Sequence, residues 1–236
     1  MTDNGTPVSA RFSPEGTAST PAAGVAGRLV LIAGATSASG EAVARALTAA
    51  GATVLAVGTR PEALDALAES VPGVDTRACD LADRDAVAEL AMRIHLKFAR
   101  IDGLVHLVGG WRGGGGIAGQ SDADWEFLDR GFRTLRNTTR VFYDDLAASP
   151  AGRLATVSST AVDKPYAGGA NYAAAKAAAD AWTRAVAQGF GKEAPQSAAV
   201  AFVVKTLAGL EARLGEEVVR LWDADPASVN GARLPL

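Results

Sequence analysis

Two side chains that could move a proton, Tyr172 and Lys176, stand four residues apart in this chain. The alanine-rich segment 170–188 is predicted to be helical, and that spacing puts both side chains on one helix face about a turn apart. A lysine cation beside a tyrosine favours the phenolate and lowers a pKa that is ordinarily about 10, so the phenol can exchange a proton with a carbonyl or alcohol oxygen. Ser159, at the end of a predicted strand, could hydrogen-bond the same oxygen and fix its orientation. The three residues together predict acid–base chemistry, whereas a Tyr–Lys pair alone is typical of many exposed helix faces.

The elements that must position these residues are predicted from hydrophobic patterning. Short apolar runs alternate with longer amphipathic segments, which is typical of a parallel sheet covered by helices on both faces. Strands are predicted at 29–33, 53–57, 74–78, 104–108, 153–158 and 199–204, with a last extended piece at 232–236. Helices are predicted at 41–50, 61–69, 83–99, 122–146, 170–188 and 210–221. The prediction is an α/β fold with a doubly wound parallel sheet of the Rossmann type.

The domain organisation follows from length and composition. With 236 residues, of which 48% are hydrophobic, the chain can bury one core of ordinary size. We predict a single Rossmann-like domain over residues 27–236. Residues 1–26 are rich in Thr, Ser, Pro, Gly and Ala without periodicity, and we predict that they form a disordered tail.

Composition also excludes several classes of protein. Lysine and arginine number 23 against 26 aspartates and glutamates, a net charge of −3, which argues against nucleic acid as the main partner. The sequence contains no long apolar run and no export signal, so we expect no membrane partner. The single cysteine, Cys79, forms no internal disulfide, and no Cys/His cluster has zinc spacing, so we expect no metal and a cytoplasmic location.

A glycine-containing turn, residues 34–40, follows the first predicted strand and opens the first predicted helix. Backbone N–H groups and the helix dipole at such a turn favour a diphosphate. Glycine is required where the backbone takes unusual dihedral angles or comes close to a ligand. The candidate cofactor-binding residues of the turn are Gly34, Thr36, Ser37, Ser39 and Gly40. The alternative is a tight strand–helix turn that binds nothing.

The end of the second predicted strand bears on which dinucleotide would bind. An acidic residue there contacts the adenosine ribose of NAD, whereas an arginine accommodates the extra phosphate of NADP. The chain has Gly58-Thr59-Arg60 and no carboxylate, so Arg60 with Ser37 and Thr59 could form a phosphate pocket. The pattern favours NADP(H) over NAD(H), with a solvated surface arginine as the alternative.

The order of these motifs resembles the short-chain dehydrogenase/reductase family. The glycine turn, the pair Asp80-Leu81 after the third strand, Ser159, and the segment from Tyr172 to Lys176 occur in the family's order, and Ser159 stands thirteen residues before Tyr172. The resemblance covers about residues 27–236. It implies a small-molecule substrate and a homodimer or homotetramer.

The resemblance also implies a role for each matching residue. Tyr172 would be the catalytic acid/base, Lys176 would bind the nicotinamide ribose and tune Tyr172, and Ser159 would orient the substrate carbonyl. Asp80 would contact the adenine with Leu81 beside it. The resemblance places Gly109, at the end of the fourth strand, near the cofactor.

Three departures from the family pattern concern the cofactor and proton path. Ala38 stands where the glycine motif usually has a further glycine, and residues 106–109 read His-Leu-Val-Gly in place of Asn-Asn-Ala-Gly. Phe132 occupies the position of a catalytic asparagine. Asn137, five residues further along the predicted helix, lies about 140° around it and so faces elsewhere.

A fourth departure concerns the substrate. After the sixth strand, residues 203–209 lead almost directly to the next helix, without the family's helical lid. We therefore expect a bulky carbonyl substrate, polycyclic or carrier-held, in an open pocket. Trp111 and Arg112, in a glycine-rich loop, are candidate substrate-binding residues, since an indole stacks on rings and a guanidinium meets carboxylates or phenols. The alternative is a loop without ligand contact.

These observations predict an NADP(H)-preferring ketoreductase or alcohol dehydrogenase of secondary metabolism. One alternative keeps the cofactor pocket but uses Tyr172 for non-redox chemistry, as a cyclase, dehydratase or epimerase. Another is a non-catalytic dinucleotide-binding partner protein, which would not need Ser159, Tyr172 and Lys176 together.

Overall fold

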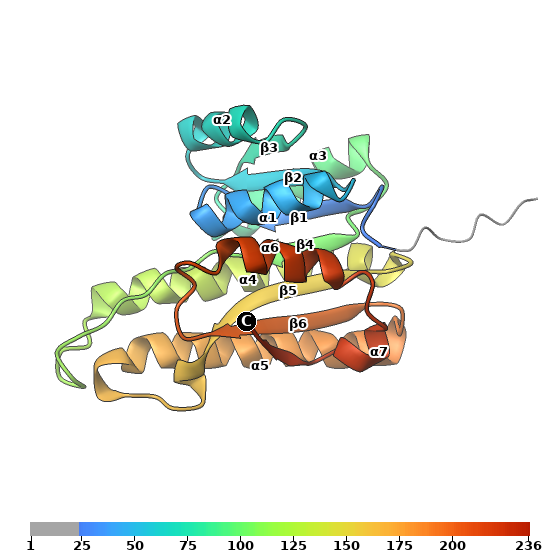
Figure 1. Ribbon diagram of the computed structural model, residues 1–236. Helices are drawn as coiled ribbons and strands as arrows, with labels where there is room; N and C mark the ends of the chain where they lie inside the picture. The colour runs from blue at the N-terminus through green and yellow to red at the C-terminus, as the bar shows by residue number, and fades with distance from the viewer. Residues whose placement is uncertain (1–23) are drawn as a thin grey trace, which may run out of the picture.

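The computed structural model describes residues 24–236, which fold around one parallel sheet (Figure 1). Within this range the strands are β1 (Leu29–Ala33), β2 (Thr53–Gly58), β3 (Asp75–Ala78), β4 (Gly103–His106), β5 (Arg153–Ser159), β6 (Ala198–Val204) and β7 (Arg233–Pro235). The α-helices are α1 (Ala38–Ala49), α2 (Pro61–Ser70), α3 (Arg84–Lys97), α4 (Asp122–Ala148), α5 (Ala170–Glu193), α6 (Glu211–Arg220) and α7 (Pro226–Val229). Two short 3₁₀ helices, η1 (Thr160–Val162) and η2 (Ala167–Gly169), lie between β5 and α5.

The strand order is β3-β2-β1-β4-β5-β6-β7, and every neighbouring pair is parallel. The chain therefore runs outward from β1 in one direction and then outward from β4 in the other. This confirms the predicted doubly wound sheet. In such a sheet a crevice opens beyond the carboxyl ends of the strands where the order reverses, here between β1 and β4.

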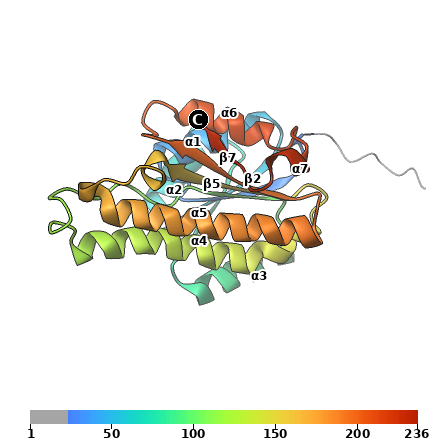
Figure 2. The same ribbon diagram turned by 90° about the horizontal axis from the view of Figure 1, so that it is seen from below.

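Helices cover both faces of the sheet, as Figure 2 shows with α3, α4 and α5 on one side and α1 and α6 on the other. Alternate residues of β1 pack against the helices on opposite faces of the sheet, because successive strand side chains point to opposite faces. Leu29 and Leu31 pack in the layer with α3, α4 and α5, whereas Val30 and Ile32 pack with α1 and α6. None of the helices in residues 24–236 is both long and apolar enough to cross a membrane.

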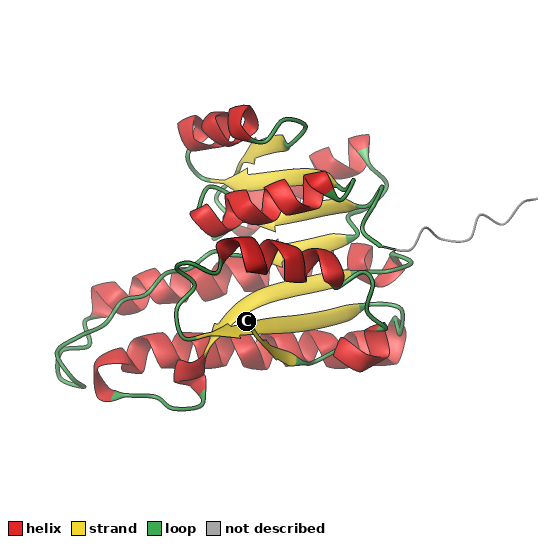
Figure 3. Cartoon of the chain, in the orientation of Figure 1, coloured by secondary structure: helices red, strands yellow, loops and turns green. Residues whose placement is uncertain are grey.

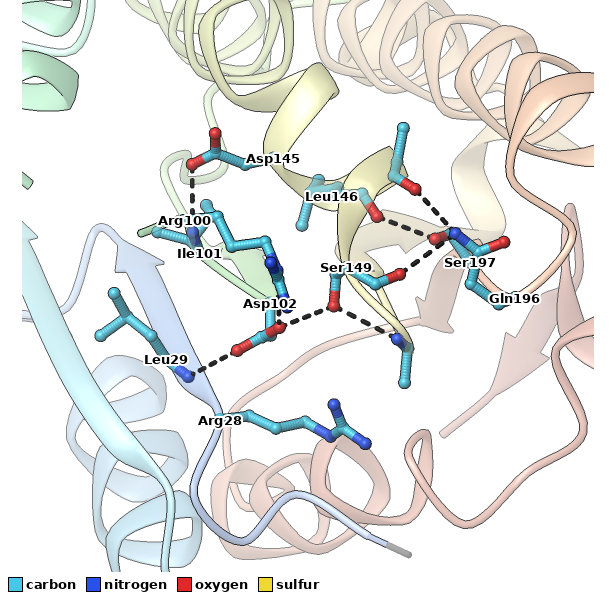
Figure 4. Close-up of polar contacts among 12 residues, drawn as sticks. Arg28, Leu29, Arg100, Ile101, Asp102, Asp145, Leu146, Ser149, Gln196 and Ser197 are labelled. Atoms are coloured by element: carbon cyan, nitrogen blue, oxygen red, sulfur yellow. Dashed lines mark hydrogen bonds and ion pairs between the residues drawn. The ribbon is translucent and has the colours of Figure 1, made fainter. Parts of the chain in front are cut away.

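Polar contacts hold the amino-terminal edge of the sheet together (Figure 4). The Asp102 carboxylate accepts hydrogen bonds from the Leu29 N–H (3.1 Å) and the Ser149 hydroxyl (2.6 Å). Asp145 of α4 accepts from the Ile101 N–H (3.0 Å), and Ser197 donates to the Leu146 carbonyl (2.8 Å). These contacts bind β1, β4, α4 and β6 to one another at the edge opposite the crevice.

The structure extends two predicted boundaries. Helix α5 continues to Glu193 instead of ending at 188. Within this extension Gly189 lies against Tyr143 of α4, whose hydroxyl would lie 2.3 Å from a Cβ there. The predicted tail 1–26 lies outside the described residues as far as residue 23, and Val25 is buried in the core at 3% exposure. Figure 3 shows strands and helices alternating along the described chain as far as β6, after which α6 and α7 precede β7.

Candidate active site

Two adjoining cavities lie beyond the carboxyl ends of the central strands. The larger, of about 710 Å³, is lined by residues that include Ser159, Tyr172 and Lys176. The smaller, of about 220 Å³, extends toward β2 and β3. Both are lined by Val108, Gly109 and Gly131, so they form one trough across the point where the strand order reverses.

The glycine turn forms one wall of this trough. A Cβ at Gly34, where φ is +82°, would lie 2.9 Å from the Val108 backbone nitrogen, so the turn packs directly against the chain leaving β4. A Cβ at Gly40 would lie 2.3 Å from the Ala35 carbonyl oxygen, which only glycine avoids. Ser37 caps α1 by accepting a hydrogen bond from the Gly40 N–H (3.0 Å).

The turn residues divide between the two cavities. Ser37 and Ser39 line the larger cavity, and Gly34 and Thr36 line the smaller. Ala38 is the first residue of α1 and is exposed, and no non-glycine residue in 24–236 has a positive φ. The methyl group of Ala38 therefore causes no backbone strain in the turn.

Asp80 and Leu81 line the far end of the smaller cavity, where the resemblance places the adenine. Both carboxylate oxygens of Asp80 lie 2.7 Å from the Arg130 guanidinium of α4, and one accepts the Ala82 N–H. Burial alone would raise the pKa of Asp80, but the Ala82 N–H and Arg130 outweigh it and hold that pKa below its ordinary value. Arg130 lines the same cavity and was not predicted, because no local pattern connects it with a residue fifty positions earlier.

Arg60 lies just beyond β2, at the amino end of α2, and is exposed. It lines neither cavity, although its neighbour Thr59 lines the smaller one. Among residues 24–236 its guanidinium makes no ion pair. The side chain is thus available to a group bound at the end of β2.

Ser159, Tyr172 and Lys176 come together in the larger cavity from β5 and α5. The Ser159 hydroxyl caps η1 by accepting the Ala161 N–H (3.1 Å), and it lies beside the Tyr172 phenol. The predicted lowering of the Tyr172 pKa is wrong for this geometry. Burial raises that pKa above its ordinary value, Tyr166 adds to the rise, and the nearby Ser159 hydroxyl only partly offsets it.

Lys176 lies one turn along α5 from Tyr172, with its ammonium 5.9 Å from the centre of the phenol ring. The ammonium donates to the Val157 carbonyl (2.7 Å). Burial lowers the pKa of Lys176 to about 8, although the nearby Asp180 carboxylate acts in the opposite direction. This lysine therefore changes charge within the ordinary working range of pH.

His106 occupies the start of the segment that departs from the family pattern, and its side chain lines the larger cavity. Burial, followed by the Lys176 charge, lowers the pKa of His106 to about 3, so its imidazole is neutral. The Thr134 hydroxyl donates to the Gly131 carbonyl (2.7 Å) and so accepts from His106 Nε2 (2.8 Å). This pair joins the end of β4 to α4.

Phe132 and Asn137, the two α4 positions considered for the missing asparagine, have different surroundings. Phe132 lines the larger cavity and packs edge-on against Trp182 of α5. Asn137 is buried and donates to the carbonyls of Leu81 (3.1 Å) and Ala82 (3.0 Å). Its side chain ties α4 to the segment after β3, as its predicted position on another helix face implies.

The glycine-rich loop before α4 is tied to the start of α5. Gln120 Nε2 lies 2.9 to 3.2 Å from three carbonyl oxygens, those of Gly114, Gly116 and Gly168. Gln120 Oε1 accepts the Asn171 N–H (3.0 Å), which satisfies a first-turn donor of the helix that carries Tyr172. No sequence signal indicated this role, since the partners are backbone groups.

The two loop residues predicted to bind substrate separate in the structure. Trp111 lines the larger cavity, and its indole N–H donates to the Tyr166 hydroxyl (3.2 Å). Arg112 lines neither cavity and instead stacks its guanidinium 3.8 Å from the ring centre of Phe127. The loop therefore contributes Trp111 to the cavity wall, and Arg112 holds the loop against α4.

Replacing Gln120 with alanine is expected to loosen the wall that Trp111 forms, because four backbone contacts lose their partner. Each lost hydrogen bond is worth about 0.5–1.5 kcal/mol, and water replaces part of that. We expect about a tenfold rise in KM for the substrate, with a change of less than twofold in the affinity for the dinucleotide. Steady-state kinetics and a dinucleotide titration check this. An unchanged KM would show that the hydrogen bonds of Gln120 are not needed to hold the loop in place.

The predicted absence of a helical lid is visible at the end of β6. That strand ends at Val204 and α6 begins at Glu211, so only residues 205–210 connect them. Lys205, Thr206 and Leu207 line the larger cavity directly. Among the residues described, no group of three or more His, Cys, Asp or Glu side chains could hold a metal ion.

A doubly wound sheet with a trough where the strand order reverses is typical of dinucleotide-binding α/β proteins. Comparison with known proteins identifies the family. The short chain dehydrogenase family profile matches residues 28–206. The chain belongs to that family, which confirms the resemblance found in the sequence.

Two curated relatives are similar over most of the domain. A 2,3-dihydro-2,3-dihydroxybenzoate dehydrogenase from Bacillus subtilis is 35% identical over 173 residues, 69% of this chain and 64% of that protein. An NADP-dependent 3-hydroxy acid dehydrogenase from Salmonella typhi is 34% identical over 151 residues, 63% of this chain and 61% of that protein. The matches thus span less than two thirds of the length of either relative.

A solved structure shows the same fold. A metagenomic short-chain oxidoreductase in complex with NADP superposes with a TM-score of 0.79 at 24% identity, covering 89% of this chain and 97% of the other. This likeness concerns the arrangement of the sheet and its helices, since function depends on the site and not on the fold.

Proposed function

We propose that this protein is an NADP(H)-preferring oxidoreductase that moves a hydride between the nicotinamide and a substrate carbonyl carbon. The observation that carries the proposal is the convergence of Ser159, Tyr172 and Lys176 on a cavity that adjoins the cavity of the glycine turn. Catalytic hydroxyls and a cation beside a dinucleotide-sized trough fit carbonyl reduction and its reverse.

The residues of the trough fit such a cofactor. The amino end of α1 and the hydroxyls of Ser37 and Ser39 suit a diphosphate, and no carboxylate lines the larger cavity. When bound, the nicotinamide supplies or accepts the hydride. Lys176 lines the larger cavity and would hold the ribose hydroxyls, and Asp80 and Leu81 border the adenine end.

The protein's own residues would then handle the oxygen and its proton. Ser159 positions the substrate oxygen by donating a hydrogen bond to it. In reduction Tyr172 gives its phenolic proton to that oxygen, and its raised pKa keeps the phenol protonated at neutral pH. The ammonium of Lys176 stabilises the phenolate that is left behind. In oxidation the proton travels the opposite way.

Preference for NADP(H) rests on the end of β2. Arg60 is exposed there without an ion pair within the described range, and no carboxylate occupies the neighbouring positions 58 and 59. One of the two relatives is named as NADP-dependent, which agrees with this preference. We further propose a cytoplasmic homodimer or homotetramer acting on a bulky carbonyl compound, polycyclic or carrier-held, in secondary metabolism.

Titration with NADPH and NADH, followed by quenching of tryptophan fluorescence, tests the cofactor proposal. NADPH is expected to bind about ten- to a hundredfold more tightly, since charge-assisted hydrogen bonds from Arg60 to the extra phosphate contribute about 1.5–3 kcal/mol. Arg60→Ala should remove most of that difference without weakening NADH.

The matched control is Arg84→Ala, an exposed arginine at the start of α3 that lines neither cavity. Its NADPH affinity should stay within twofold of the original protein. Equal binding of NADPH and NADH would reject the preference. Binding of neither would reject the redox function and favour a non-redox enzyme or a partner protein.

A further inference from the structure

We propose that the substrate of this site carries an anionic group on a flat ring, and that Lys164 and Lys205 bind this group at the mouth of the larger cavity. A carboxylate is the simplest such group. The inference rests on the proposed function for the statement that the ligand is a substrate. The binding site itself stands on observations that are independent of hydride transfer.

The charge of the larger cavity is the first observation. Three lysines line it, Lys164, Lys176 and Lys205, and no aspartate or glutamate does. The whole sequence contains only five lysines, so most of them gather at this one cavity. A cavity whose only charged lining residues are cations attracts an anion and raises the local concentration of that anion.

The position of the two outer lysines is the second observation. In the sheet register Ser159 of β5 pairs with Val204 of β6, so Lys205 follows directly on the strand beside Ser159. Lys164 follows η1, the short helix that Ser159 caps. Both are exposed, and both line the larger cavity together with Ser159, whose hydroxyl would orient the reacting oxygen. Lys176 differs, because its ammonium is held by the Val157 carbonyl.

The nearby carboxylates do not neutralise these two lysines. Asp163, beside Lys164, forms an ion pair with Arg233 of β7, which lowers the pKa of that carboxyl. Glu211, at the start of α6, accepts the Gly209 N–H (2.8 Å). Within residues 24–236 neither Lys164 nor Lys205 forms an ion pair. Their charges are therefore free to meet a ligand.

The flat ring is inferred from two aromatic residues that line the same cavity. Trp111 is 54% exposed and Tyr166 is 51% exposed, although both line the cavity and are joined by the indole–phenol hydrogen bond. Gln120 holds the loop that carries Trp111 in place. Exposed aromatic faces at a cavity wall gain most from a planar apolar partner. Cations and rings together suit an aromatic or cyclic carboxylate.

Calorimetric binding of 2-naphthoate and of 2-naphthamide, with and without NADP⁺, tests this inference without any turnover. The two ligands share one ring system and differ in charge. We expect 2-naphthoate to bind at least tenfold more tightly. Lys164→Met and Lys205→Met should each weaken it about three- to tenfold and leave 2-naphthamide unchanged. Lys192→Met, at an exposed position near the end of α5 that lines neither cavity, should change neither ligand.

Several outcomes would overturn the proposal. Equal affinity for the two ligands, binding of neither, or equal loss of both in the lysine variants would show that charge is not recognised. If the variants weaken NADPH and not 2-naphthoate, the anion is a cofactor phosphate and not a substrate. If 2-naphthoate binds as expected but 1-tetralone-6-carboxylate is not reduced by NADPH, the anion site stands and the redox function fails.

Discussion

Replacing Tyr172 with phenylalanine is expected to lower kcat for NADPH-dependent ketone reduction by about 10³-fold, because the carbonyl oxygen loses its proton donor. The Tyr172 phenol lies beside Ser159 in the larger cavity, and its raised pKa keeps it protonated at neutral pH. The loss should fall on kcat, since the phenol acts on the reacting oxygen and not on the rest of the substrate. Initial rates with 1-tetralone-6-carboxylate, followed by NADPH absorbance, measure it.

Tyr143→Phe is the matched control, because Tyr143 packs between α4 and α5 with its ring stacked on Phe190, away from both cavities. That variant should retain activity within threefold of the original protein. Binding of NADPH should be the same in Tyr172→Phe and in the original protein. If Tyr172→Phe kept more than a tenth of the activity, another group would have to supply the proton, and the assignment of Tyr172 would be wrong.

Replacing Lys176 with methionine is expected to reduce activity at least a hundredfold and, at the same time, to stabilise the fold by about 2 kcal/mol at pH 7. A pKa of about 8, against 10.5 for a free lysine, corresponds to about 3 kcal/mol of unfavourable burial of the charge. The lost hydrogen bond to the Val157 carbonyl offsets about 1 kcal/mol of that gain. Thermal unfolding should show a Tm about 4–8 °C higher.

The stability that Lys176→Met gains is expected to depend on pH. Between pH 8 and 10.5 the unfolded chain binds more protons at Lys176 than the folded chain, so the stability of the original protein rises with pH across that window. Below pH 8 both states are protonated and the full penalty is present. The advantage of Lys176→Met should therefore be largest at pH 7 and shrink toward pH 10. An equal advantage at both pH values would show that packing, not charge, is responsible.

The same pKa predicts a kinetic profile. The value of kcat/KM for reduction should fall as pH rises through about 8, because Lys176 loses the charge that stabilises the Tyr172 phenolate. Lys176→Arg keeps a cation above pH 10 and should move that inflection upward, even if its activity is lower. A merely structural role for Lys176 would leave the inflection where it is.

Local sequence was sufficient for the elements and for most of the trough. The strand ranges 29–33, 53–57 and 199–204 agree with β1, β2 and β6 within one residue, because buried parallel strands are short apolar runs bounded by turn residues. The spacing of Tyr172 and Lys176 put them on one face of α5, since four residues are one helical turn. Gly34 and Gly40 were predictable because their backbone geometry excludes a side chain.

The direction of the Tyr172 pKa was not predictable in this way. Four residues of spacing indicated a cation near the phenol, but burial by the cavity walls dominates, and those walls come from distant segments. The Asp80–Arg130 pair and the hydrogen bonds of Gln120 were not predictable either. Their partners lie about fifty residues away or are backbone groups, which have no sequence signature. For Arg112 the sequence predicted a contact that the structure does not show. Its guanidinium stacks on Phe127, whereas the sequence predicted that it binds substrate.

The sequence by itself therefore determined the family, the order of the elements and the residues that can do chemistry, because periodicity, glycine geometry and helical spacing act over a few neighbouring positions. Only the tertiary structure decided which of these residues share a cavity and in which protonation state they lie. It placed Lys164, Lys176 and Lys205 around one cavity without an opposing carboxylate in its lining. Desolvation and charge pairing depend on everything that packs around a group, and that environment is assembled from distant parts of the chain.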